Sequence, residues 1–254
     1  MLNLRNLNTK TFIILLAVIL GIFSIYLIFY FIKTTPEPLP APEEPKIEDI
    51  QVLFVQALKT SSGYDVAARI KNPNELWGAP ELEYTLSLLD SKGKLIAKRK
   101  GTSFIGPQEE KYLIELMIQV QDNTLSAEVE INNKGWKKFE GYKKPKISVV
   151  SKHYKPDKID IVWGVIRNDS PYGFVRVGIN VVVFDEKQNI IGISHTFVGN
   201  ILTRKERYFE VRLIKKISNI SKIEVEPEVN AMEPGNYMKD YGEPSGYEER
   251  ETGR

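Results

Sequence analysis

The 254-residue chain has no cysteine and only two histidines, His153 and His195. The lack of cysteine excludes disulfide bonds, thiolate metal ligands, lipid attachment to cysteine and a cysteine nucleophile. Two histidines with no third ligand marked nearby are typical of ordinary strand residues rather than of a zinc site. Patterns for a P-loop, a serine-hydrolase elbow, a zinc-protease helix and an EF-hand are missing too. The sequence therefore predicts neither catalytic residues nor a cofactor nor a metal.

The chain also lacks an excess of either charge outside its first segment. Three of its 35 basic residues, Arg5, Lys10 and Lys33, fall within the first 33 positions, which hold no acidic residue. The remainder has 32 basic and 33 acidic residues. A nearly neutral body has no general field to attract a polyanion, so we expect no nucleic-acid partner.

No charge interrupts residues 12–32, FIILLAVILGIFSIYLIFYFI. These 21 residues are long enough, as a helix, to cross a hydrocarbon core of about 30 Å. A cleaved signal peptide is the alternative, but its apolar region is usually shorter and ends at small residues. We expect an uncleaved anchor in the bilayer. Arg5 and Lys10 before the helix, against Lys33 after it, predict a cytoplasmic N-terminus and an extracytoplasmic body.

An internal repeat follows the anchor. ARIKNP at 68–73 matches GVIRND at 164–169, LSLLDSKGKLIA at 86–97 matches VVVFDEKQNIIG at 181–192, and EKYLIEL at 110–116 matches ERYFEVRL at 206–213. The period of about 95 residues is that of a whole domain. Apolar residues alternate in stretches such as FVRVGINVVVF, and turn signals separate these stretches. The sequence predicts an all-β fold with two tandem immunoglobulin-like antiparallel sandwiches after one transmembrane helix.

The order of these segments predicts the domain organisation. The proline- and glutamate-rich segment at 33–46 is an extended spacer, and the last residues lack apolar periodicity. The predicted parts are a cytoplasmic head at 1–11, a transmembrane helix at 12–32, a linker at 33–46, sandwiches at 47–135 and 145–230 with a linker at 136–144 between them, and a disordered tail at 231–254.

The second copy resembles a known family. Its run from Gly164 through VIRND and VRVGINVVVFDEKQNIIG to ERYFEV resembles FxLYD-type β-sandwich domains of bacterial and archaeal envelope proteins. Their hallmark is an apolar strand that ends in an aromatic residue and Asp at a hairpin, here Phe184-Asp185. The chain is also similar to the wider late-embryogenesis-abundant type 2 (WHy-like) sandwiches. The second copy lacks the Leu-Tyr pair, and Leu89 precedes Asp90 in the first. The resemblance implies an envelope-exposed module without assigned catalysis.

Two features are candidates for partner binding. One is the pair of loops after the repeated residues Asn72 and Asn168, which are rich in aromatic residues. The other is the segment NKGWKKFEGYKKPK at 133–146, which alternates aromatic and basic residues. Packing of these aromatic residues onto the domain cores is the alternative interpretation. The candidate residues are Trp77, Trp136, Tyr142, Tyr172, Phe174, Lys137, Lys138, Lys143 and Lys144.

These observations favour a non-enzymatic envelope protein, anchored in the cell membrane by one helix. Its tandem sandwiches are expected to act as a spacer and to bind an envelope protein. Binding of a wall polymer or glycan through the loop aromatics and the lysine-rich segment is the alternative function. A membrane-anchored hydrolase would need a cavity with perturbed carboxylates.

Overall fold

The computed structural model describes residues 9–34, 46–120, 126–214 and 216–238, and the chain divides into two units at Lys46. The first unit contains the helix α1, Thr9–Thr34. Its stretch Phe12–Lys33 is long and apolar enough to cross a membrane, although a signal sequence near an N-terminus passes the same test. Most of the head at 1–11 and of the spacer at 33–46 lies outside the described residues.

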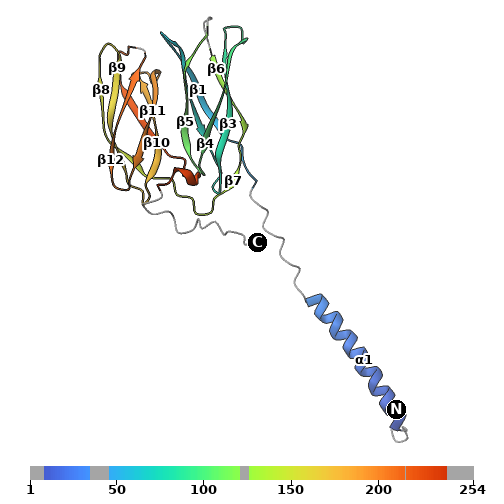
Figure 1. Ribbon diagram of the computed structural model, residues 1–254. Helices are drawn as coiled ribbons and strands as arrows, with labels where there is room; N and C mark the ends of the chain where they lie inside the picture. Colours follow the sequence, from blue (N-terminus) through green and yellow to red (C-terminus); the bar gives the residue numbers. More distant parts are fainter. Residues whose placement is uncertain (1–8, 35–45, 121–125, 215, 239–254) are drawn as a thin grey trace, which may run out of the picture. The chain divides into compact units, whose positions relative to one another are not determined.

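The second unit is built from two sandwiches of six main strands each (Figure 1). Sandwich 1 contains β1 Gln51–Thr60, β2 Gly63–Lys71, β3 Trp77–Leu89, β4 Leu95–Ile105, β5 Glu110–Ile118, β6 Ser126–Asn133 and the short β7 Lys137–Lys138. Sandwich 2 contains β8 Ile147–Lys155, β9 Asp160–Asn168, β10 Phe174–Phe184, β11 Ile190–Ile201, β12 Glu206–Leu213 and β13 Lys222–Glu228. The predicted all-β class with one N-terminal helix is confirmed.

The two sandwiches share one antiparallel topology. Sandwich 1 pairs its strands in the orders β1-β2-β5 and β4-β3-β6, and sandwich 2 in the orders β8-β9-β12 and β11-β10-β13. The strand orders therefore correspond one to one, as the sequence repeat predicts. The apolar residues of alternating strand positions form the core of each sandwich, with Val177, Ile179, Val181 and Val183 of β10 in that of sandwich 2.

Side chains of the repeat perform the same local task in both copies. Asp90 Oδ1 accepts hydrogen bonds from the N–H groups of Lys92 and Lys94, and Asp185 Oδ1 accepts them from Lys187 and Asn189. These bonds confirm that the two aspartates close hairpin turns, in which a carboxylate satisfies the backbone two residues on.

The repeated asparagines are buried and hold the loops that follow β2 and β9. Asn72 donates from Nδ2 to the carbonyls of Trp77 and Gly106, and Asn168 donates to those of Tyr172 and Ile201. Both residues are fully buried. The backbone carbonyls of these loops thus find their donors in one amide side chain per copy.

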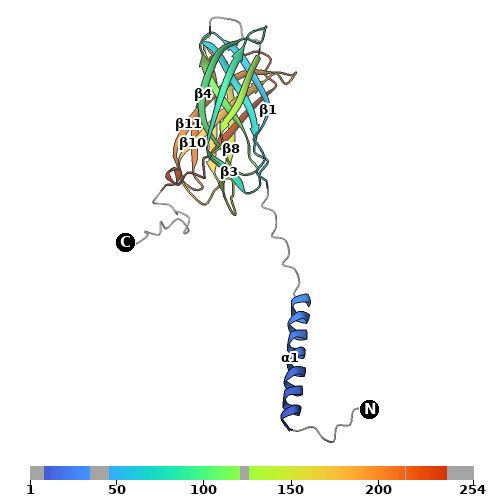
Figure 2. The same ribbon diagram turned by 90° about the vertical axis from the view of Figure 1, so that its right-hand side faces the viewer.

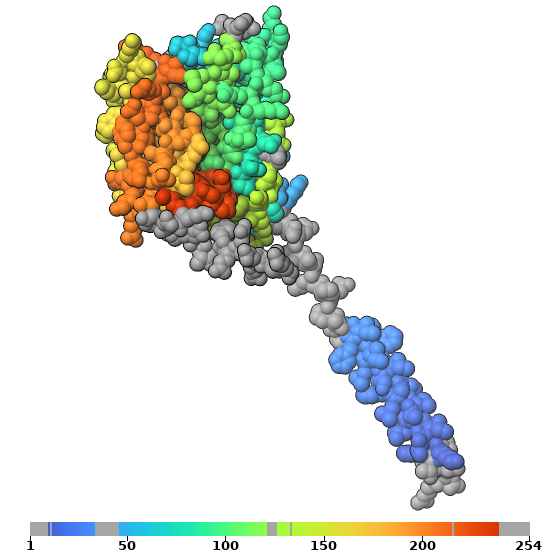
Figure 3. Space-filling view, in the orientation of Figure 1, coloured from blue at the N-terminus to red at the C-terminus, as the bar shows by residue number. Residues whose placement is uncertain are grey.

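The four sheets stack in the order β8-β9-β12, β11-β10-β13, β1-β2-β5, β4-β3-β6 from left to right in Figure 1, and Figure 2 views this stack from the side of β3 and β4. The two middle sheets meet through an apolar cluster of both sandwiches, which comprises Leu58, Ala67, Tyr112, Val182, Phe184, Ile190 and Ile193. Strands of the two sandwiches lie in contact along their length in the space-filling view (Figure 3). β10 is therefore buried on both faces, against its own core and against sandwich 1.

The structure corrects the predicted tail and the predicted linker. Residues 231–238 were expected to be disordered, but they include the 3-10 turn η2, Pro234–Asn236, and pack on sandwich 2. The Asn236 amide bonds to both backbone groups of Arg176, and the Tyr237 ring packs on Phe174, so these residues are ordered without an apolar periodicity. In the segment 136–144, β7 pairs with β3 at Trp77 and Gly78, so sandwich 1 extends into that segment. Residues 239–254 lie outside the described part.

Candidate functional sites

A cavity of about 400 Å³ opens where the segment between the sandwiches meets the loop after β9 and the chain after β13. This junction cavity is lined by residues of the stretches 139–146 and 169–174 and by Ala231 and Tyr237. Its volume lies in the range of small-molecule sites. Four of the sequence candidates line it: Tyr142, Lys143, Tyr172 and Phe174.

Aromatic rings make up much of the cavity wall. The ring of Tyr237 packs on those of Tyr172 and Phe174, with centroids 5.6 and 5.5 Å apart, and Phe139 packs on Tyr142 at 6.2 Å. The Tyr142 hydroxyl is buried and has no hydrogen-bond partner within the described structure. Burial, together with the nearby carboxylate of Glu109, raises the pKa of Tyr142. The rings form an apolar wall, and the Tyr142 hydroxyl within it remains neutral at physiological pH.

Charged residues of both signs line the cavity: Glu140, Lys143, Lys146 and Asp169. Glu140 pairs with Lys138 at 3.1 Å, and Asp169 pairs with Arg167 at 2.7 Å. Lys143 and Lys146 are exposed, and the ion pairs found among the described residues include neither of them. The cavity therefore combines aromatic rings with the exposed ammonium groups of Lys143 and Lys146, and the charge of Lys146 also acts on the Asp169 carboxylate.

The structure does not bring the remaining sequence candidates into this cavity. Trp77 and Trp136 lie at the same end of sandwich 1, and Trp136 packs against the core of that sandwich. Lys144 pairs with the buried carboxylate of Glu109 at 2.8 Å, while Lys137 and Lys138 form the exposed strand β7. Phe174 lines the cavity but is only 1% exposed, so it belongs to the core of sandwich 2 rather than to a contact surface.

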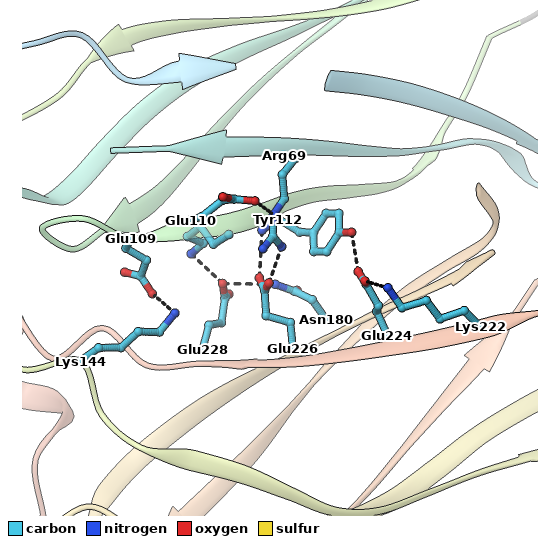
Figure 4. Close-up of polar contacts among 11 residues, drawn as sticks. Arg69, Glu109, Glu110, Tyr112, Lys144, Asn180, Lys222, Glu224, Glu226 and Glu228 are labelled. Atoms are coloured by element: carbon cyan, nitrogen blue, oxygen red, sulfur yellow. Dashed lines mark hydrogen bonds and ion pairs between the residues drawn. The ribbon is translucent and has the colours of Figure 1, made fainter. Parts of the chain in front are cut away.

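A second cluster, which the sequence analysis missed, joins the two sandwiches (Figure 4). Three glutamates of β13, Glu224, Glu226 and Glu228, face sandwich 1. Glu226 pairs with Arg69, and its other oxygen accepts the backbone N–H of Tyr112 at 3.0 Å. The Tyr112 hydroxyl donates to Glu224 at 2.7 Å. Polar contacts thus border the apolar cluster between the middle sheets.

The most buried member of this interface cluster is Lys111 of β5. Its side chain is 1% exposed, and Nζ lies 2.6 Å from Glu228 Oε2 and 3.6 Å from the centroid of the Phe104 ring. The same Glu228 oxygen accepts a hydrogen bond of 3.2 Å from Nδ2 of Asn180 on β10. A signal for this cluster exists in the sequence, because KIEVEPE places three glutamates on one face of a strand and EKYLIEL places a lysine at a core-facing position.

A third feature is an aromatic row on the outer face of the sheet β8-β9-β12. His153 stacks on Trp163 with centroids 4.1 Å apart, and Tyr208 lies 6.1 Å from Trp163 on the other neighbouring strand. Tyr208 is 54% exposed. The corresponding face of sandwich 1, which contains Tyr112, is the one that sandwich 2 covers. The aromatic row therefore lies on the face of sandwich 2 that is equivalent to the domain-contacting face of sandwich 1.

The two histidines lie apart from each other, on β8 and β11. Burial lowers the pKa of His195, and the carboxylate of Glu228 only partly offsets that effect. Within the part of the chain that the structure describes, no group of three histidine, cysteine, aspartate or glutamate residues is placed to hold a metal ion.

No family model matches the chain, and a search of curated proteins finds no match. Solved structures include a resemblance to red sea bream transglutaminase, with 9% sequence identity and a TM-score of 0.25. The match covers 72% of this chain and 29% of that enzyme. A likeness at this level carries no argument about function.

Proposed function

We propose that this chain is a non-enzymatic, single-pass protein of the cell envelope, whose two sandwiches serve as a rigid spacer and a protein-interaction module. The long apolar stretch Phe12–Lys33 supports a membrane anchor. The basic residues Arg5 and Lys10 before it favour a cytoplasmic N-terminus and an extracytoplasmic body.

The observation that carries this proposal is the interface between the sandwiches. Relative motion of two domains is expected unless their interface is extensive and apolar. Here an apolar cluster spans both middle sheets, and ion pairs such as Arg69–Glu226 and Lys111–Glu228 border it. The two sandwiches therefore present their outer faces at a fixed separation. An anchor in the same membrane would confine these faces and raise their effective concentration for a neighbouring partner.

The outer face of β8-β9-β12 is the surface that best suits a protein partner. Trp163 and Tyr208 belong to the residue types that carry most of the binding energy at protein interfaces. Arg167, Glu206 and Glu210 border the row with charges of both signs, as at the polar rim of an interface. The two opposite outer faces differ, because Glu83, Lys98, Lys100 and Glu130 on β4-β3-β6 are charged.

A photo-crosslinking amino acid at position 208 tests this proposal in intact cells. We expect full-length protein with the crosslinker at 208 to capture one or a few discrete proteins, and the matched chain with the crosslinker at Lys100 to capture none. Trp163→Glu, in the 208-labelled chain, is expected to abolish the capture. Equal capture at both positions, or none at 208, would contradict a docking role for this face.

The junction cavity favours a second candidate function, the binding of an anionic wall polymer or glycan. Its aromatic rings suit sugar rings, and Lys143 and Lys146 suit an anionic group. In this case the double variant Tyr172→Ala with Lys143→Gln should lose binding to purified envelope polymer, measured by co-sedimentation of the full-length protein. Lys98→Gln, on the other sandwich, is the control and should retain it. Binding unchanged in the double variant would rule out this cavity.

A further inference from the structure

Lys111, Asn180 and Glu228 bring an amine, a primary amide and a carboxylate together inside the protein. The three side chains come from β5 of sandwich 1 and from β10 and β13 of sandwich 2. One oxygen of Glu228 lies 2.6 Å from Lys111 Nζ and 3.2 Å from Asn180 Nδ2. A single carboxylate oxygen therefore bridges a nucleophile and a carboxamide whose nitrogen is a leaving group.

The amine and the amide are buried, whereas the Glu228 side chain is 15% exposed and lines an open pocket with Ser103 and Phe104. Lys111 is 1% exposed, and Asn180 is 3% exposed. The ring of Phe104 covers Nζ at 3.6 Å, and Ser103 Oγ lies 3.2 Å away. Lysine is rarely buried to this extent, and a buried, oriented amine next to a base is the usual setting of a lysine nucleophile. Burial of the amide also protects it from hydrolysis.

A glycine permits this arrangement. Gly178 lies opposite Glu228 on the neighbouring strand, and a Cβ at position 178 would stand 2.7 Å from Glu228 Cγ. The missing side chain lets the glutamate lie across β10 toward Asn180 and Lys111. The repeat contains no second copy of the cluster, because the positions equivalent to Lys111 and Asn180 are Arg207 and Thr85.

From this geometry we propose that Lys111 and Asn180 form an intramolecular isopeptide bond across the two sandwiches, with Glu228 as the proton-transfer group. Glu228 accepts a proton from the Lys111 ammonium, and the neutral amine attacks Cγ of Asn180. The new bond joins Nζ to Cγ, and the bond from Cγ to Nδ2 breaks. Lys111 loses two protons through Glu228. The first proton converts the departing amide nitrogen to ammonia, and the second converts that ammonia to ammonium. Glu228 is a carboxylate again once both protons have been passed on.

This reaction needs no oxidant and no cofactor, and its only by-product is ammonia. The fold holds the two reacting groups against one carboxylate, so the reaction is intramolecular and gains the corresponding advantage in rate. The product ties residue 111 to residue 180 and so closes a covalent loop through both sandwiches. A chain without cysteine would obtain in this way a cross-link that a reducing environment does not break. The inference does not depend on what the outer faces bind.

Mass spectrometry of the full-length protein, purified in detergent, tests the bond. We expect an intact mass about 17 Da below that of the sequence, the mass of one ammonia. A protease digest should contain a branched peptide that joins Lys111 to Asn180. An intact mass equal to that of the sequence, with both residues recovered in linear peptides, would overturn the proposal. A loss of ammonia located at residues other than Lys111 and Asn180 would overturn it too. The wild-type protein alone decides this point.

Two variants and one matched control test the roles of the groups. Lys111→Met and Glu228→Gln should both have the full mass of their sequences and lack the branched peptide. Lys222→Met removes a lysine that pairs with Glu224 on the same strand as Glu228 but is about half exposed, so it should keep the branched peptide. A branched peptide at full yield in Glu228→Gln would exclude Glu228 as the proton-transfer group.

Discussion

Tyr112 and Tyr208 occupy the same position of the repeat, 96 residues apart, yet their side chains have opposite surroundings. Tyr112 is 5% exposed and donates to Glu224 of the other sandwich, whereas Tyr208 is 54% exposed and donates to Glu210 of its own strand. Each hydroxyl thus has a carboxylate acceptor, and only the burial differs. The face of β1-β2-β5 that contains Tyr112 is therefore covered by sandwich 2, whereas the equivalent face of β8-β9-β12 that contains Tyr208 is open.

This difference predicts unequal costs for the same substitution. Tyr112→Phe removes a part-buried hydrogen bond to Glu224, which keeps its ion pair with Lys222, and should lower the free energy of unfolding by about 1 kcal/mol. Tyr208→Phe removes an exposed bond and should change it by less than about 0.5 kcal/mol. Urea unfolding of the two variants, followed by tryptophan fluorescence, makes the comparison. Equal effects would contradict the burial of Tyr112 at the interface.

The interface ion pairs give a second prediction. Arg69→Met leaves the partly buried carboxylate of Glu226 without its guanidinium and should lower the free energy of unfolding by about 2–4 kcal/mol. Arg99→Met, which breaks the more exposed pair with Glu115, is the control and should cost less than about 1 kcal/mol. Thermal unfolding of both variants tests this. A smaller loss in Arg69→Met than in the control would show that the sandwiches do not depend on this pair.

The buried asparagines Asn72 and Asn168 give a third prediction about stability. Asn72→Ala would remove the amide donor of the Trp77 and Gly106 carbonyls and the acceptor of the Asn74 N–H, while Gly106 O keeps the N–H of Glu109. A buried unsatisfied group costs about 1–3 kcal/mol. We expect a loss of about 2–4 kcal/mol from Asn72→Ala and a similar loss from Asn168→Ala. Asn189→Ala removes an exposed amide and is the control, with a loss below about 1 kcal/mol. Chemical denaturation distinguishes these outcomes.

Asp160 predicts the acid sensitivity of sandwich 2. Burial alone would raise its pKa, but hydrogen bonds from Ile217 N, the Tyr154 hydroxyl and Asp157 N outweigh burial and lower it. A lowered carboxyl pKa contributes stability above the unfolded value of about 3.9, and this contribution disappears as the pH falls through the folded value. We expect the urea midpoint to fall below about pH 4, with a shallower fall in Asp160→Asn.

The pKa of Asp65 is shifted in the opposite direction from that of Asp160, so its effect on stability in acid is opposite too. Burial raises its pKa, although the Met117 N–H opposes that effect. Its contribution to stability is therefore present at low pH and declines as the pH rises through the raised value. Asp65→Asn should accordingly steepen the fall in acid. A matching change in both variants would mean that neither carboxyl governs the pH profile.

The sequence predicted the sandwiches because each depends on local signals. Alternation in FVRVGINVVVF, the Asp turns and the repeated Asn residues act within one copy. The apolar run at 12–32 likewise predicted α1, which extends a few residues further at each end. The candidate aromatic residues fell partly into cores, as Phe174 and Trp136 show, because an aromatic side chain on a loop near a core tends to fold back on it.

The contacts between sandwiches could not be predicted in the same way. Lys111 and Glu228 are 117 positions apart, and their pairing depends on which face of one copy meets which face of the other. A period in the sequence does not determine that choice. The order of residues 231–238 was not predicted for a related reason: the Asn236 amide and the Tyr237 ring attach them to distant parts of sandwich 2, without an apolar periodicity along the segment.

The contact between the sandwiches is front to back: β1-β2-β5 of one meets β11-β10-β13 of the next, and these sheets are not equivalents in the repeat. Such a head-to-tail contact leaves one sheet of each kind uncovered, so a further copy of the sandwich would again expose the same kind of sheet. Further duplication would therefore pair the same two kinds of sheet at each new interface. On one side the charged face of β4-β3-β6 ends the series. On the other side, the open face of β8-β9-β12 has Trp163 where the covered face of β1-β2-β5 has Ala67. A domain that binds this open face must therefore accommodate an indole ring that sandwich 2 does not meet on sandwich 1.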